Sequence, residues 1–164
     1  MIEKRNVNEG VKSLARFSDC EKYRYTLTRI WDAGKGRILF IGLNPSTADE
    51  MKNDPTVTRM INYAKLWGYG SITVCNLFAF RATFPRDLKK SEEPIGKEND
   101  KWIYNEIENS EKVIAAWGNH GKFLSRIGEV MKYLKGAESF GLTKQGEPKH
   151  VLYLRGDAET GKFE

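Results

Sequence analysis

The chain has 164 residues, of which 40% are hydrophobic, and this predicts one domain over residues 1–164, with a core at about 23–154 and frayed tails at both ends. No apolar run approaches the ~20 residues that span a membrane, and the charged start lacks the apolar segment of a secretory signal. We therefore expect a cytoplasmic protein without a membrane partner. A net charge of +5 permits nucleic acid or a nucleotide as a partner without requiring one.

The first half of the chain predicts a strand–helix–strand unit. Strand-favouring residues over 23–31 precede a Gly-containing turn, which predicts an outer strand. The apolar run 38–42 predicts a buried strand, and Asp54-Pro55 predicts the start of a helix with apolar residues at helical spacing. A second apolar run over 71–78 completes a βαβ unit, so the two buried strands should pair in parallel.

The second half predicts two more helices around a third buried strand. The stretch 79–97 is long for a connection, which is typical of functional loops, and a helix over about 98–110 follows. A buried strand over 112–118 then precedes a regular amphipathic helix over about 123–134. We expect an α/β fold: a three-layer α/β/α sandwich with a central, mostly parallel sheet.

Polar residues follow the first buried strand, where α/β proteins commonly bind ligands. Asn44 is the leading candidate there, although it could simply satisfy backbone groups in the turn before Pro45. Ser46 is a candidate base contact and Thr47 a candidate phosphate contact. Asp49 could orient a water molecule.

The second strand and the end of the chain add amide and imidazole groups. The side chain of Asn76 has one acceptor and two donors, which suit the O and N–H edge of a pyrimidine, although Asn76 could merely end its strand. His150 could donate to a substrate oxygen or transfer a proton near neutral pH. We assign Phe78 to the same base-binding site. Arg81 and Lys149 are candidate phosphate contacts, but exposed basic residues need no such role.

The sequence predicts neither a metal nor another cofactor. No spacing of His, Cys, Asp and Glu matches a metal site. Cys20 and Cys75 are too few for a disulfide framework or for the four thiolates of an iron–sulfur cluster, and we expect both to be reduced.

Seven stretches carry a resemblance to a known family over roughly residues 23–154. They are LNPSTADE, DPTVTR, WGYG, NLFAFRAT, PIGKEND, AAWGNHG and GEPKHVLYL. On these, the chain resembles the uncharacterised DUF1643 family. The family pattern leads us to expect His-Pro near the end, whereas here Val151 follows His150, which removes a local constraint on the backbone.

More distantly, the layout resembles the uracil-DNA glycosylase superfamily, whose first motif follows the first strand and whose histidine lies near the end. This resemblance implies that Asn44 positions the attacking water, Asn76 recognises the base and His150 supports glycosidic cleavage. An amide cannot act as a general base, so hydrolysis by Asn44 would be slow or different.

Three functions of different classes follow. The first is recognition of a nucleobase or nucleotide with hydrolysis of its N-glycosidic bond, which in DNA requires the base to leave the stack. The second is a non-catalytic module that binds nucleotides or modified bases. The third is a protein-interaction scaffold, which predicts an exposed apolar patch.

Overall fold

The structure is a computed structural model that describes residues 1–163, and its strands form a single eight-stranded sheet with the order β1-β2-β3-β5-β4-β6-β7-β8. The strands are β1 (Ile2–Asn8), β2 (Val11–Phe17), β3 (Arg24–Ile30), β4 (Arg37–Gly42), β5 (Ser71–Asn76), β6 (Lys112–Ala115), β7 (Glu138–Ser139) and β8 (Gly161–Lys162). The helices are α1 (Pro55–Leu66), α2 (Pro85–Lys90), α3 (Asn99–Glu108) and α4 (Arg126–Val130), with 3₁₀ turns η1 (Asn119–Ser125) and η2 (Met131–Tyr133).

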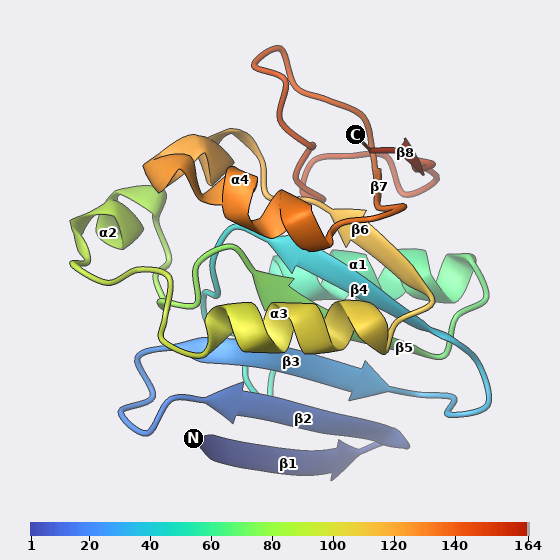
Figure 1. The fold of residues 1–164 in the computed structure, drawn as a ribbon. Helices are drawn as coiled ribbons and strands as arrows, with labels where there is room; N and C mark the ends of the chain where they lie inside the picture. The colour runs from blue at the N-terminus through green and yellow to red at the C-terminus, as the bar shows by residue number, and fades with distance from the viewer. Residues whose placement is uncertain (164) are drawn as a thin grey trace.

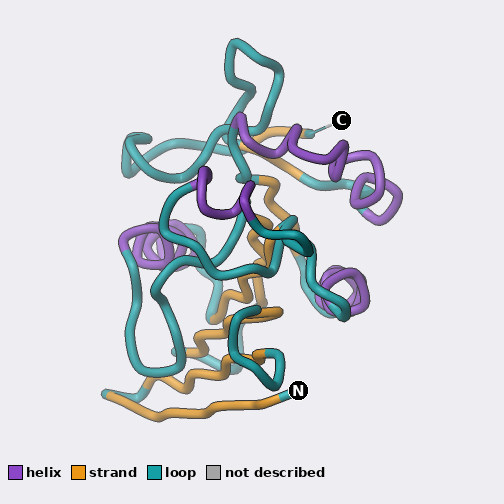
Figure 2. Tube along the Cα trace, turned by 90° about the vertical axis from the view of Figure 1, so that its left-hand side faces the viewer, coloured by secondary structure: helices purple, strands orange, loops and turns teal. Residues whose placement is uncertain are grey.

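The prediction of a three-layer α/β/α sandwich with a mostly parallel sheet is wrong. The sheet is mixed: β4–β5, β4–β6 and β6–β7 pair in parallel, whereas β1–β2, β2–β3, β3–β5 and β7–β8 pair antiparallel. The few helices lie beside the central strands, and β1 and β2 extend beyond them (Figures 1 and 2). Short connections between the first strands cause this difference, because short loops join antiparallel strands while parallel pairing needs a long crossover.

The amino-terminal tail, predicted to be frayed, is instead a β-hairpin. Its two-residue turn, Glu9-Gly10, has positive φ at both positions (49° and 79°), which is the turn geometry that matches the twist of paired strands. As a result β3 lies inside the sheet between β2 and β5, and the prediction of an outer strand there is also wrong. The charged sequence of β1 hid the hairpin, because polar residues are typical of an exposed edge strand.

The predicted βαβ unit is confirmed. Strands β4 and β5 pair in parallel along their whole length, from Arg37 opposite Ser71 to Gly42 opposite Asn76. Helix α1 connects them, and Asp54 is its N-cap: Oδ1 accepts a hydrogen bond from the Val57 N–H at 2.8 Å.

Alternate residues of the central strands point to two separate apolar cores. In β4, Ile38 and Phe40 pack on the side of α1, whereas Leu39 and Ile41 pack on the side of α3 and α4. Burial of both strand faces explains the continuous apolar run. Within residues 1–163, no helix has the length and apolar character that crossing a membrane would require.

The predicted regular helix over 123–134 is broken near its start. Leu124 and Ser125 have positive φ values of 55° and 53°, so η1 ends there and α4 begins at Arg126. The break allows the Arg126 side chain to reach the carbonyl of Leu77 on the buried side of the sheet (2.7 Å). Tertiary contacts therefore outweigh the helical pattern of this segment.

Candidate functional site

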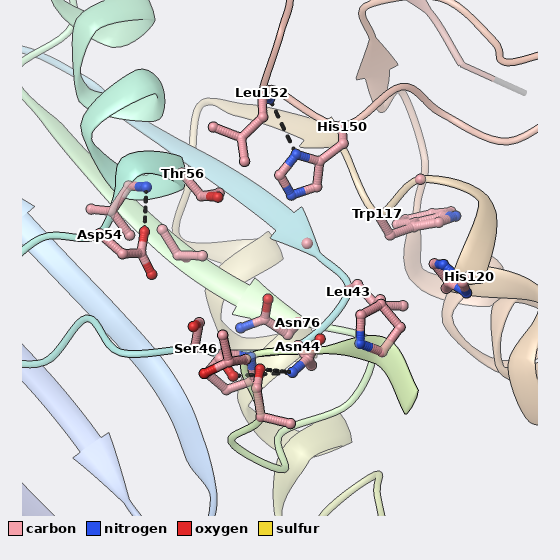
Figure 3. A pocket seen from close by; sticks show the side chains of 18 of the residues that line it. Leu43, Asn44, Ser46, Asp54, Thr56, Asn76, Trp117, His120, His150 and Leu152 are labelled. Carbon is pink, nitrogen blue, oxygen red and sulfur yellow. Dashed lines mark hydrogen bonds between the residues drawn. The ribbon is translucent and has the colours of Figure 1, made fainter. Parts of the chain in front are cut away.

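A cavity of about 490 Å³ lies at the carboxyl ends of β4, β5 and β6, within the range of small-molecule sites. It contains four of the predicted residues: Asn44, Ser46, Asn76 and His150. Figure 3 shows Asn44, Ser46 and Asn76 on one side, with Asp54, Thr56 and His150 on the other. The parallel pairing of the three strands brings these distant segments together.

Asn76 is the most deeply buried polar group of the predicted set, with 3% of its surface exposed. The Nδ2 atom of Asn76 is buried and has no hydrogen-bond partner among residues 1–163. Below, a buried polar atom that lacks a hydrogen-bond partner in this way is called open. Gly42 makes room for this amide, because a Cβ at Gly42 would lie 2.8 Å from Asn76 Oδ1. On the other side of the strand, Asn99 Nδ2 donates to the backbone carbonyls of Asn76 (2.9 Å) and Leu77 (3.2 Å). The backbone is thus fixed while the amide faces the cavity.

Asn44 has a structural task as well as a place in the cavity wall. Its Nδ2 donates to the carbonyls of Ala82 (2.8 Å) and Pro45 (3.1 Å). These bonds join the loop after β4 to the loop after β5. The donors of Asn44 are therefore engaged by the protein, and its oxygen is the group that it offers to a ligand.

The segment that carries His150 is held against the end of β6. Trp117 Nε1 donates to Glu147 Oε2 at 3.0 Å, and the backbone N–H of Gly118 donates to the carbonyl of Pro148 at 2.9 Å. Gly118 has a φ of 72°, which favours glycine at this turn. The AWGNHG and GEPKH stretches thus act together to place the imidazole.

His150 is a neutral hydrogen-bond donor at neutral pH. Its Nδ1 accepts from the Leu152 N–H at 3.1 Å, so the ring proton is on Nε2. Burial lowers the pKa of His150, and the nearby carboxylate of Asp54 opposes this only in part. The Leu152 bond orients the ring without the proline expected at Val151, which is itself fully buried.

Arg24 also lines the cavity, and the sequence analysis missed it. Only 2% of its surface is exposed; Nη1 donates to the Ala48 carbonyl at 2.9 Å, and Nε is open. A β-bulge explains both its position and the omission. Arg16 pairs with Thr26 but Phe17 pairs with Arg24, so Tyr25 is the extra residue. The bulge turns Arg24 to the face that regular alternation would give to Tyr25.

The other five predicted site residues lie outside the cavity lining. Phe78 is buried in the core on the side of α3 and α4, with its ring centroid 5.4 Å from that of Phe123. Burial acts to raise the pKa of the Asp49 carboxyl, but Oδ1 accepts hydrogen bonds from two backbone N–H groups of its own loop. The pKa is lowered as a result. Thr47 and Lys149 are exposed, and Arg81 donates to the backbone carbonyl of Glu21, just before β3.

The comparisons with known proteins give one match. The model of a family described as "Protein of unknown function (DUF1643)" matches residues 24–152, which begins at Arg24 and includes every cavity residue discussed above. Neither the curated proteins nor the solved structures gave a match. Among residues 1–163, no three His, Cys, Asp or Glu side chains are grouped so that they could hold a metal ion.

Proposed function

The chain belongs to the DUF1643 family, and we propose that its cavity binds a nucleobase or nucleotide through the side chain of Asn76. The open Nδ2 of Asn76 carries this proposal. A buried amide without a partner destabilises the protein unless a ligand or water completes its hydrogen bonds. An amide offers a donor beside an acceptor, which is the pattern that complements the edge of a base.

Two further groups suit the same ligand. The Nε2–H of His150 is a donor from the opposite side of the cavity, and a carbonyl oxygen of a base would accept from it. The Oδ1 of Asn44 is an acceptor beside Asn76. Together the three side chains supply donors and acceptors around one flat ring, with apolar wall residues such as Leu43 and Met60.

Hydrolysis of an N-glycosidic bond is the reaction that we propose for this site. The resemblance of the stretches around Asn44 and His150 to the glycosylase motifs supports this reaction, and Asp54 adds a carboxylate to the cavity wall. In such a reaction the carboxylate would orient water toward the sugar carbon, while His150 would donate to the departing base. Asp54 would then have two tasks, since its Oδ1 also caps α1.

A non-catalytic binding module is the second candidate, and the bonds of Asn44 favour it. Asn44 stands where the glycosylase motif would position water, yet its Nδ2 joins two loops. In a binding module, Asn44 would serve only to hold these two loops of the binding site together. Release of free base distinguishes the two candidates, because a binding module would release none.

The test is binding of free bases and nucleosides to the wild type and to Asn76→Leu, measured by calorimetry, with base release followed by chromatography. We expect Asn76→Leu to lose at least about tenfold in affinity, because a ligand hydrogen bond disappears, while its unfolding free energy changes little. The matched control is Asn99→Leu, which loses two buried backbone bonds and should be less stable by about 1–3 kcal/mol. Equal affinity in Asn76→Leu and the wild type would overturn the proposal.

A further inference from the structure

Three arginine side chains are buried, and two of them have oxygen partners throughout. Arg126 donates to the carboxylates of Asp100 and Glu129. Arg29 donates to several oxygen atoms of the loop over 49–53. Both arrangements satisfy a buried guanidinium, which otherwise is costly to remove from water.

Arg24 is the exception. Within the described residues 1–163 it forms no ion pair, and its Nε is open. Burial lowers its pKa to about 10, so it remains a cation at neutral pH. Asp54 partly offsets this effect, while Arg29 and Arg81 add to it. The cavity lining itself contains one guanidinium, Arg24, and one carboxylate, Asp54.

We propose that Arg24 binds the phosphate of the ligand, so that the cavity recognises a nucleoside monophosphate. A guanidinium is planar and presents paired donors that match phosphate oxygens. The first turn of α1 borders the same cavity and adds the Thr56 hydroxyl and the positive end of the helix. Recognition of the base in this inference rests on the proposed function, whereas binding of the phosphate rests on Arg24.

The depth of Arg24 favours a mononucleotide over a nucleic-acid strand. When a base is extruded from a strand, the backbone phosphates stay at the rim of the pocket. Arg24 is 2% exposed, within the wall of a cavity of about 490 Å³, where a rim phosphate would not reach it. The phosphate must therefore enter with the base. In contrast, the exposed Lys149 would meet a polymer, but it lies outside the cavity lining.

The experiment compares affinities for nucleosides and their 5′-monophosphates by calorimetry. The probes are uridine, cytidine, thymidine, adenosine and guanosine, each with and without the phosphate, and the proteins are the wild type and Arg24→Met. We expect the monophosphate of the recognised base to bind the wild type at least about tenfold more tightly than the nucleoside. In Arg24→Met this ratio should fall to about one, because the phosphate contact is removed. The bond to the Ala48 carbonyl is lost as well, and the affinity for the nucleoside measures that effect separately.

Two further variants control for charge and folding. Lys149→Met removes the same charge from an exposed position outside the cavity lining and should keep the wild-type ratio. Arg24→Lys keeps the charge but loses the paired donors, and should give an intermediate ratio. If Arg24→Met does not fold, the ratio measured in Arg24→Lys tests the phosphate contact.

Three results would overturn the inference. The wild type could show no preference for the monophosphate, the preference could persist in both Arg24 variants, or an oligonucleotide without terminal phosphates could bind with the same dependence on Arg24. If no nucleoside or nucleotide binds, the proposed function fails, and inorganic phosphate decides the anion site by itself. Thermal stabilisation by phosphate over chloride that is lost in the Arg24 variants would support the site, and no such stabilisation would refute it.

Discussion

Two buried arginines on opposite faces of the central sheet differ in how their polar atoms are satisfied. On the side of α3 and α4, Arg126 is fully buried and donates to two carboxylates and to the carbonyl of Leu77. On the cavity side, Arg24 and Asn76 are almost as deeply buried, yet each has an open nitrogen. Both faces contain exceptions to the rule that buried polar groups are hydrogen-bonded, because four open atoms also lie in or just after α3: Asn99 Oδ1, Trp102 Nε1, Glu106 Oε2 and Ser110 Oγ.

This difference teaches where to expect a ligand. A protein selected for stability alone would fill or satisfy such positions, because an unmatched buried donor has a desolvation penalty of about 1–3 kcal/mol. Of the six open atoms among residues 1–163, those of Arg24 and Asn76 belong to one cavity at the carboxyl ends of the parallel strands, whereas the other four lie in or just after α3. Open polar atoms that share one cavity are better explained by a common partner than by two separate defects.

Replacing each of the two arginines in turn should reveal the largest difference in unfolding free energy. Arg126→Met should lower the free energy of unfolding by about 3 kcal/mol or more, because three charge-assisted hydrogen bonds disappear. Arg24→Met should lower it by about 1 kcal/mol or less, since the lost bond to Ala48 is offset by removal of a buried charge. Urea unfolding measures both values, and equal losses would mean that Arg24 is as structural as Arg126.

Gly42→Ala should have the next largest effect, on binding as well as on stability. The new methyl group would lie 2.8 Å from Asn76 Oδ1, so the amide must move, at about 1–3 kcal/mol of unfolding free energy. Nucleoside affinity should fall with it. Gly128→Ala is the control, because a methyl group there meets nothing within 4 Å. Unchanged affinity in Gly42→Ala would show that the position of Asn76 does not matter for the ligand.

A smaller effect is expected from the pH dependence of His150. Because burial lowers its pKa, the unfolded chain takes up this proton first as the pH falls. The stability that neutral His150 contributes is therefore complete above about pH 6.5 and is lost as the pH falls toward the folded pKa. His150→Gln should lose less stability than the wild type between about pH 7 and pH 5. The pKa of His120, the chain's other histidine, is also lowered, by burial and by Lys89. Because His120 is exposed, His120→Gln should change this slope less than His150→Gln does, and the reverse order would contradict the account.

Much of the cavity could be predicted from the sequence, because parallel strands bring their carboxyl ends together. Asn44 follows one apolar run and Asn76 lies near the end of another, and that pattern alone places them at one edge of the sheet. His150 was a candidate both for its chemistry and by resemblance, but no local signal placed it at this edge of the sheet, because contacts such as the one between Trp117 and Glu147 join distant segments.

The sequence could not reveal Arg24 or exclude Phe78. Strand alternation assigns Arg24 to the face opposite Leu27, and only the bulge at Tyr25 reverses this. Phe78 lies two residues beyond Asn76, after β5 has ended, so its direction depends on the loop and not on the strand period. The fold class failed for a related reason: the antiparallel hairpin of residues 2–17 has too few apolar residues to be predicted from hydrophobic periodicity.

The central claim is that the Asn76 amide is completed by a ligand, and its own NMR signal is the most direct test. The side-chain NH₂ resonances of Asn76 can be assigned in ¹⁵N-labelled protein by their loss in Asn76→Leu, and then followed as nucleosides and monophosphates are added. We predict that these resonances shift on saturation while those of Asn99, already bonded to two carbonyls, stay in place. Binding that leaves the Asn76 resonances unmoved would contradict the account.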